Sequence, residues 1–153
     1  MDRLRRLECH FARYPIWFVT ASTHQRAGIL ANSAVHEVFE KFAETGPDRG
    51  AWLGAYVLMP DHFHAFVSLD ERELALSTWM KSLKNTVSKT LRLAGIPSPH
   101  WQKGFFDHTL RSTESYSEKW HYVRENPVRA KLVAQWIDWP YLGEPHRLEF
   151  RHL

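Results

Sequence analysis

Two β-patterned segments separated by only two residues constrain the fold of this chain more than any other feature. The segments are Trp52–Met59 and His62–Leu69, and Pro60-Asp61 joins them. A tight Pro-Asp turn between two such segments predicts a β-hairpin. We therefore expect an antiparallel sheet in which these two strands lie side by side.

The second strand of this hairpin has two different faces, because side chains alternate along a strand. One face is fully apolar and should pack on helices; it comprises Phe63, Ala65, Val67 and Leu69. The other face carries His62 and His64, so both imidazoles project to the same side and can share one metal ion. We expect this second face to be the one that the core does not require.

Further elements surround the hairpin. Pro15–Thr20 is β-branched and aromatic and predicts a strand, and residues 101–110 predict a short strand with a turn. Helical spacing of apolar residues predicts helices from Asn32 or Ser33 to Ala43, from Glu73 to Leu93, and from about residue 112 to the residue before Pro127. The predicted order is strand, helix, strand, strand, helix, strand, and then a last helix.

Composition limits the class of protein. The chain has 153 residues, of which 44% are hydrophobic and 14% aromatic, which suits one domain with a real core. We expect residues 1–153 to form that domain, with 128–153 as a C-terminal tail that packs on it. The net charge of +3 is too small to identify a nucleic-acid binder by itself.

Cysteine usage and hydropathy suggest a location. Cys9 is the one cysteine, which excludes a disulfide framework and a cysteine zinc site. No apolar run is long enough to span a membrane, and the basic start lacks the apolar core of a secretory signal. We expect a cytoplasmic protein.

The last predicted helix carries a second group of candidate residues. Tyr122 and Asn126 are four residues apart, so a phenol and an amide point to one side of that helix. Tyr116, Trp120 and Val123 define its apolar stripe, and Tyr122 lies more than about 90° from the stripe's centre. A buried aromatic role for Tyr122 is therefore disfavoured. Asn before Pro is also a common helix-ending residue, and both roles can hold for Asn126.

The histidine pair has a plain alternative. The chain contains 10 histidines, so one His-x-His can arise by chance, and the pair could be two strand histidines without a ligand. A rigid apolar strand around them and matching donors on a distant helix favour a metal site.

Polar and basic residues suggest where a phosphate backbone could bind. Five residues cluster opposite the apolar stripe of the helix that ends at Leu93: Lys81, Lys84, Asn85, Ser88 and Arg92. Arg111, Arg124 and Arg129 add positive charge around the candidate tyrosine. Phosphate binding and an ordinary solvated helix face are equally good interpretations of the first cluster.

Three sequence blocks together resemble a known family. MPDHFH, WQKGFFDHTLR and ESYSEKWHYVRENPVRAKLV, in this order and spacing, resemble the REP-associated tyrosine transposases of the HUH single-tyrosine superfamily. The resemblance spans roughly Tyr14 to Tyr141. It implies an α+β fold, a ferredoxin-like α/β sandwich whose antiparallel sheet carries the histidines on a central strand, with helices packed on it.

The same resemblance implies a chemistry. His62, His64 and Asn126 correspond to the ligands of a divalent metal, Mg²⁺ or Mn²⁺, and Tyr122 corresponds to the nucleophile. Related insertion-sequence transposases usually have Gln where this chain has Asn126. The resemblance implies cleavage and rejoining of single-stranded DNA beside hairpins, with a 5′-phosphotyrosine intermediate. It also favours a monomeric, nucleoid-associated bacterial protein.

Two other functions stay open at this point. One is a domesticated hairpin-DNA-binding protein that has lost catalysis, although His62, His64, Tyr122 and Asn126 are all present. The other is a metal-dependent nuclease in which water attacks the phosphate, and it predicts cleavage without a covalent intermediate.

Overall fold

The computed structural model describes residues 8–12 and 14–150 of the chain. The expected C-terminal tail begins at Val128, and its last residues, 151–153, lie outside the described part, as does the side chain of Cys9. Among the described residues, none of the helices has the length and hydropathy needed to cross a membrane.

A five-stranded antiparallel sheet forms the centre of the molecule. Its strands, in spatial order, are β5 (Phe106–Leu110), β2 (Ile16–Ser22), β4 (His62–Leu69), β3 (Ala51–Leu58) and β6 (Leu142–Gly143). The predicted hairpin is β3–β4, with Pro60 and Asp61 in its connection. The prediction that the histidines lie on a central strand of an antiparallel sheet is confirmed, because β4 is the middle strand of the five.

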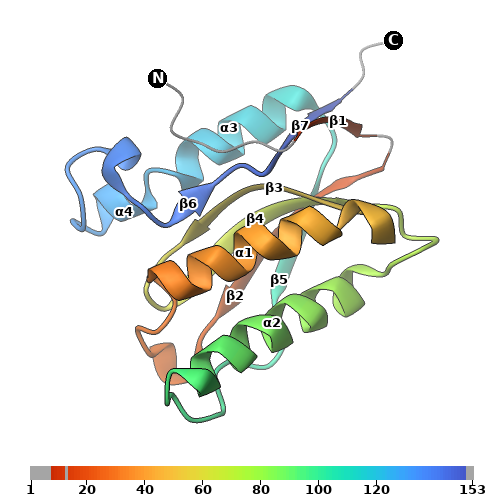
Figure 1. Ribbon diagram of the computed structural model, residues 1–153. Helices are drawn as coiled ribbons and strands as arrows, with labels where there is room; N and C mark the ends of the chain where they lie inside the picture. Colours follow the sequence, from red (N-terminus) through yellow and green to blue (C-terminus); the bar gives the residue numbers. More distant parts are fainter. Residues whose placement is uncertain (1–7, 13, 151–153) are drawn as a thin grey trace.

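Helices α1 (Ser33–Thr45) and α2 (Leu76–Leu93) cover one face of this sheet (Figure 1). Asn32 caps α1, since its side chain accepts a hydrogen bond from the Val35 N–H at 3.0 Å. Helix α2 begins three residues later than the predicted Glu73. The carbonyl of Asp70 accepts the N–H groups of Glu73 and Leu74, which closes a turn before the helix.

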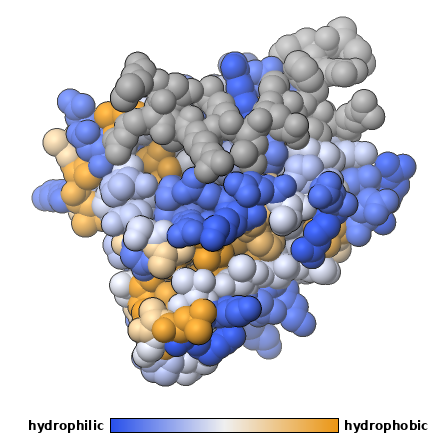
Figure 2. Space-filling view, in the orientation of Figure 1, coloured by the Kyte–Doolittle hydropathy of each residue, from blue (hydrophilic) through white to orange (hydrophobic). Residues whose placement is uncertain are grey.

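The apolar row of β4 packs under α1 and α2 as predicted. Phe63, Ala65, Val67 and Leu69 are fully buried in one core cluster with Phe39 of α1 and with Met80 and Leu83 of α2. The side of the molecule seen in Figure 2 is mainly hydrophilic, with hydrophobic groups exposed in separate small areas. A sheet face buried in this way holds β4 rigidly.

Helix α3 (Thr113–Val123) covers the other face, which corrects one expectation. Phe66 of β4 is fully buried there, and its ring centre lies 4.7 Å from that of Tyr116 and 6.3 Å from that of Trp120. The histidine face is therefore part of a second core along most of β4. Phe66 and Ser68 are needed by that core, and only the end of the strand at His62 and His64 is left partly open.

The segment after α3 also differs from its prediction. Pro127 does not end a long helix; it lies in the first turn of a short helix, α4 (Asn126–Arg129), where a missing N–H costs no helical hydrogen bond. Arg124 and Glu125 form the junction, with backbone angles close to helical values. Asn126 thus begins a helix instead of extending the one that carries Tyr122.

Two elements near the ends of the chain had no sequence prediction. Strand β1 (Glu8–Ala12) pairs in parallel with β7 (His146–Phe150), and the two form a separate small sheet. Leu148 of β7 is buried against β3, and a Cβ on Gly54 would lie 2.6 Å from the Leu148 Cδ1 atom. Trp139 is also buried and donates its indole N–H to the Leu58 carbonyl at 3.0 Å.

Candidate functional site

His62 and His64 lie side by side at one end of β4. Their ring centres are 4.9 Å apart with an interplanar angle of 80°. The His64 ring stacks on Phe18 of β2 at 5.3 Å between centres. The strand pairing of β4 with β2 and β3 on either side fixes the backbone of both residues. The two imidazoles therefore form a compact and well-supported pair.

Both histidines use the same ring nitrogen for a supporting contact. His62 Nδ1 lies 2.8 Å from the Asp61 carboxylate, and His64 Nδ1 lies 2.7 Å from the Thr20 hydroxyl. Within the part of the chain that the structure describes, neither Nε2 atom takes part in a hydrogen bond. With Nδ1 protonated and donating, each Nε2 presents a lone pair, which is the arrangement seen behind histidine metal ligands.

The electrostatics keep His64 neutral. Burial lowers the pKa of His64 to about 3, and electrostatic interactions with His62, Lys119 and Arg129 act in the same direction. A neutral imidazole can donate its lone pair to a cation, whereas a protonated one cannot. The ammonium of Lys119 on α3 lies 4.8 Å from the centre of the Phe18 ring, and that ring stacks on His64.

Tyr122 lies on the exposed side of α3. Its side chain is 62% exposed, whereas Tyr116, Trp120 and Val123 of the same helix are buried. The prediction from helical spacing that these three form the buried stripe and that Tyr122 lies off it is confirmed. Buried tyrosines mostly contribute to packing. Tyr122 is exposed, so its phenol is accessible to a ligand.

Arg129 links Tyr122 to Asn126. Its guanidinium lies 4.1 Å from the centre of the Tyr122 ring and donates to the Tyr122 carbonyl at 2.8 Å. It also donates a hydrogen bond to the Asn126 side-chain oxygen. The junction between α3 and α4 is thus held by one side chain, and that side chain also acts electrostatically on His64.

The donor set at this place suits a metal that takes few protein ligands. Among residues 8–12 and 14–150, no group of three or more His, Cys, Asp or Glu side chains could hold a metal ion. Two imidazole nitrogens would therefore need an amide oxygen such as that of Asn126, with water or phosphate oxygens completing the shell. Mixed nitrogen and oxygen donors suit Mn²⁺ at least as well as Mg²⁺, which prefers oxygen.

The residues predicted to contact phosphate on α2 lie on the other side of the sheet from the histidines. Lys81, Asn85 and Arg92 are exposed, and Lys84 is partly buried, with its ammonium donating to the Gly104 carbonyl at 2.6 Å. Ser88 departs from the expected solvent-facing position. It is 7% exposed and bonds to His100 and to the Trp101 indole, so it has no hydroxyl free for a phosphate.

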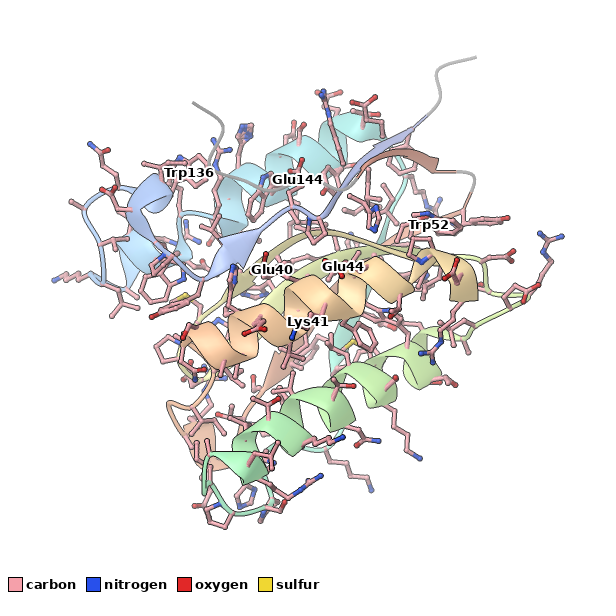
Figure 3. The ribbon with its side chains drawn as sticks, viewed as in Figure 1. Glu40, Lys41, Glu44, Trp52, Trp136 and Glu144 are labelled. Atoms are coloured by element: carbon pink, nitrogen blue, oxygen red, sulfur yellow. The ribbon has the colours of Figure 1, made fainter. Side chains whose placement is uncertain are left out.

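The three arginines near the tyrosine have different surroundings. Arg111 is exposed just before α3, and Arg129 is exposed over Tyr122. The Arg124 guanidinium instead lies 4.1 Å from the centre of the Trp136 ring. Trp136, which is labelled in Figure 3, belongs to the segment after α4. Burial lowers the pKa of Arg124. Its position indicates a packing role on the C-terminal segment.

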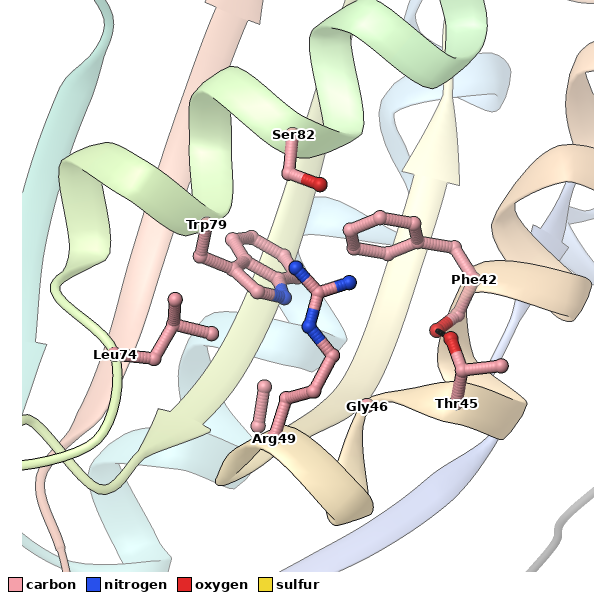
Figure 4. A pocket seen from close by; sticks show the side chains of 8 residues that line it. Phe42, Thr45, Gly46, Arg49, Leu74, Trp79 and Ser82 are labelled. Atoms are coloured by element: carbon pink, nitrogen blue, oxygen red, sulfur yellow. Dashed lines mark hydrogen bonds between the residues drawn. The ribbon is translucent and has the colours of Figure 1, made fainter.

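Two hollows lie on the α2 side of the sheet. A cavity between the end of α1 and the start of α2 has about 10 Å³, room for one water molecule at most (Figure 4). A larger groove of about 260 Å³ runs along α2. It is lined by Ser77, Met80, Lys81, Lys84, Asn85, Trp101, Gly104 and Phe105.

Sequence reasoning missed two residues that support the histidines. The Pro-Asp pattern predicts only a turn at Asp61, although a carboxylate directly before a candidate ligand is a common partner for its Nδ1–H. The β-branched pattern of residues 15–20 predicts only the end of a strand at Thr20. A polar residue at the end of an otherwise apolar run, facing the same side as the histidines, was the available signal.

Comparison with known proteins identifies the family. The model for the family described as IS200-like transposases matches residues 13–126, which include both histidines, Tyr122 and Asn126. The chain belongs to the IS200-like transposase family. The match covers four strands of the central sheet, β2 to β5, together with helices α1, α2 and α3, and it ends at the first residue of α4. The resemblance read from the three sequence blocks is confirmed.

Two individual relatives are also transposases by their description. A REP-associated tyrosine transposase of Escherichia coli K12 is 27% identical over 82% of this chain and 73% of its own length. A Haemophilus influenzae protein described in the same terms is 23% identical over 86% of this chain and 80% of its own length.

Solved structures agree on the fold. A REP-associated tyrosine transposase bound to a REP hairpin superposes with a TM-score of 0.69 at 25% identity, covering 93% of this chain and 82% of that one. A candidate transposase from Deinococcus radiodurans gives a TM-score of 0.54 at 16% identity, covering 82% of this chain and 97% of that one, and this second likeness concerns the fold alone. The predicted α+β sandwich is confirmed.

Proposed function

We propose that this chain cleaves and rejoins single-stranded DNA beside hairpin, REP-like structures through a covalent 5′-phosphotyrosine at Tyr122, with a divalent metal. Membership of a transposase family supports DNA strand transfer. A relative with 25% identity has been solved bound to a REP hairpin, which supports hairpin DNA as the partner. A monomer working in the bacterial cytoplasm, at the nucleoid, fits this proposal.

One observation carries the proposal most directly. Arg129 contacts Tyr122 and Asn126, and its charge lowers the pKa of His64. Arg129 acts electrostatically on His64 and contacts the Tyr122 ring, which supports one shared site for His64 and Tyr122. Phosphodiester transfer by a tyrosine requires such a shared site.

The proposed reaction is a transesterification. The Tyr122 hydroxyl loses its proton and its oxygen attacks the scissile phosphorus, forming a tyrosyl–phosphate bond. The bond from phosphorus to the 3′ oxygen breaks, and that oxygen takes up a proton as a free 3′-OH. Attack by a 3′-OH on the phosphotyrosine reverses these changes and joins strands. Since one phosphodiester replaces another, no energy cofactor is needed.

His62, His64 and Asn126 would hold the metal in this scheme. A bound divalent cation supplies charge stabilisation at the phosphate oxygens. Asp61 and Thr20 orient the two imidazoles, and the neutral state of His64 keeps its Nε2 lone pair available. Arg129 places a positive charge beside the phenol and near the phosphate, while Lys119 adds a second cation.

The proposed DNA grip uses the remaining exposed polar residues. Arg111 is exposed just before the start of α3, the helix that carries Tyr122, and suits the phosphates next to the cleaved bond. Lys81, Asn85 and Arg92 lie on the α2 side and suit phosphates of the hairpin stem or of a strand that passes around the sheet edge. A flexible single strand can follow such a path, whereas a rigid duplex cannot.

The test is the covalent adduct. Wild-type protein, a hairpin oligonucleotide with a single-stranded tail and Mn²⁺ are expected to give a protein–DNA species that survives denaturing electrophoresis. Tyr122→Phe should form none while still binding the hairpin, and a chelator should abolish the adduct with wild type. Tyr14→Phe is the matched control, because Tyr14 stacks on Trp52 and bonds Arg72 away from the histidines.

The same experiment separates the rival functions. A DNA-binding protein without catalysis predicts binding, no cleavage and no adduct with wild type. A nuclease that uses water predicts cleaved DNA without any adduct, and equal cleavage by Tyr122→Phe. Either result would overturn the proposal.

A further inference from the structure

Phe106 is an exposed aromatic side chain on the edge of the sheet. It is 81% exposed and lies at the start of β5, the outermost strand beside β2. Large apolar side chains at strand positions usually face a core. This one contributes to neither core cluster of the described residues. Its exposure therefore has no explanation in packing.

The register of the sheet aligns Phe106 with the histidine site. Phe106 pairs with Thr20 of β2, and Thr20 pairs with His64 of β4. Directly paired residues of an antiparallel sheet point to the same face. Phe106, Thr20 and His64 thus form one row across the three strands. The hydrogen bond of 2.7 Å between the Thr20 hydroxyl and His64 Nδ1 shows that the side chains of Thr20 and His64 lie on the same face of the sheet. Phe106 is thus on the side of the sheet that carries the histidines.

The distance is short enough for one substrate to touch both. Two strand spacings of about 4.8 Å place the backbone of Phe106 about 10 Å from that of His64. The preceding residue, Phe105, points to the other face, where its ring lies 6.0 Å from the Lys84 ammonium and lines the α2 groove. Of these two adjacent aromatic residues, Phe106 is the one that a strand at the histidines would meet.

We propose that Phe106 stacks against an unpaired base of the single strand, next to the phosphate that Tyr122 attacks. This inference rests on the proposed function and adds a base-binding position to it. Unpaired bases expose flat π surfaces, and proteins that hold single strands stack them on aromatic side chains. Such a contact accepts any base, so Phe106 would fix the position of the strand and leave the choice of sequence to other residues.

A fluorescent base analogue tests the proposal. Hairpin oligonucleotides would carry 2-aminopurine at one tail position each, and binding would be followed in the presence of a chelator, so that cleavage plays no part. We expect wild-type protein to quench one tail position strongly. Phe106→Ala should lose that quenching and bind the tailed hairpin about 5- to 150-fold more weakly, the range of aromatic-to-alanine changes at stacking sites.

Two further variants keep this test decisive. Phe106→Trp should retain the quenching, because a larger π surface replaces the ring. Leu93→Ala removes an apolar side chain of nearly the same exposure, 82%, from the end of α2, and should bind and quench as wild type does. Equal quenching and affinity for Phe106→Ala and wild type would overturn the proposal.

A second copy of this chain is the other occupant that an exposed edge aromatic could meet. Sedimentation of the same variants tests that outcome. A wild-type dimer that Phe106→Ala converts to monomer, with unchanged quenching, would assign the residue to self-association and overturn the stacking proposal.

Failure of this inference and failure of the proposed function give different results. Quenching that depends on Phe106, without any covalent adduct, would refute Tyr122 as a nucleophile and still support base stacking on Phe106. An adduct at Tyr122, together with quenching that Phe106→Ala does not change, would refute base stacking on Phe106 and leave the proposed function intact.

Discussion

The guanidinium of Arg129 lies 4.1 Å from the centre of the Tyr122 ring. This contact joins the exposed phenol of α3 to the first turn after it, because Arg129 also bonds the Tyr122 carbonyl and the Asn126 amide oxygen. In the proposed reaction, a cation held at this place would offset negative charge that develops on the phenol oxygen during attack. Arg129 would therefore act as a positioning residue for the nucleophile and for a metal ligand together.

The first prediction concerns Arg129→Ala. We expect the single-turnover rate of adduct formation to fall about 2- to 30-fold, since cation–π contacts contribute roughly 0.5–2 kcal/mol. Arg129→Lys should retain part of the rate, because the charge stays while the two hydrogen bonds are lost. Arg49→Ala removes an exposed arginine beyond the end of α1 and serves as the control. A wild-type rate for Arg129→Ala would refute the assigned role.

The second prediction concerns the partners of the imidazoles. Thr20→Val removes the hydroxyl at His64 Nδ1, and Asp61→Asn replaces the carboxylate at His62 Nδ1. We expect each change to weaken Mn²⁺ binding about 10- to 100-fold, the usual effect of losing such an outer partner. Calorimetric titration with Mn²⁺ measures this directly.

The control for Thr20→Val is Thr109→Val, a substitution of the same kind on β5. Thr109 pairs with Trp17, so it faces the α1–α2 side of the sheet, away from the histidines. Equal Mn²⁺ affinities for the two valine variants would count against His64 as a ligand.

Sequence reasoning went furthest where side-chain periodicity and burial agree. The alternation in His62–Leu69 gave the strand and its apolar face, and the helical spacing of Tyr116, Trp120 and Val123 gave the buried side of α3. These features depend on neighbours within one element, so a single sequence contains them. The exposure of Tyr122 follows from the same spacing.

Features that depend on contacts between distant elements could not be obtained in this way. The burial of Ser88 requires His100 and Trp101, which return to α2 from a loop. The parallel pairing of β1 with β7 joins the two ends of the chain, and no local pattern specifies it. The row from Phe106 through Thr20 to His64 exists only once strand order and register are known.

The third prediction concerns the core between β4 and α3. Phe66→Ala removes a fully buried ring that contacts Tyr116 and Trp120, and we expect it to lower the free energy of unfolding by about 3–5 kcal/mol. Leu93→Ala, at an exposed position, should change it by less than about 0.5 kcal/mol. Urea unfolding measures both. Similar stabilities of the two variants would mean that α3 is not held by this core.

The fourth prediction concerns acid stability of the metal-free protein. Burial lowers the pKa of His64 to about 3 in the folded chain, below the ordinary value of about 6.5 in the unfolded one. Protonation therefore favours the unfolded state. The stability contributed by neutral His64 is complete above about pH 6.5 and is lost progressively as the pH falls towards 3.

Replacement of this histidine by a residue that does not titrate should flatten that dependence. We expect His64→Gln to lose less stability than wild type between pH 6.5 and pH 4, whatever its stability at neutral pH. Urea unfolding at several pH values, with chelator present, gives the slopes. Parallel slopes for the two proteins would show that His64 titrates normally in the fold.

Peptide mass spectrometry of the covalent adduct identifies the tyrosine that is joined to DNA. Trypsin is expected to release Trp120–Arg124, which contains Tyr122 as its one tyrosine. After nuclease digestion of the DNA, we expect a 5′-phosphonucleotide mass on that peptide alone. The same mass on the peptide that contains Tyr116, or cleaved DNA with every peptide unmodified, would contradict Tyr122 as the nucleophile.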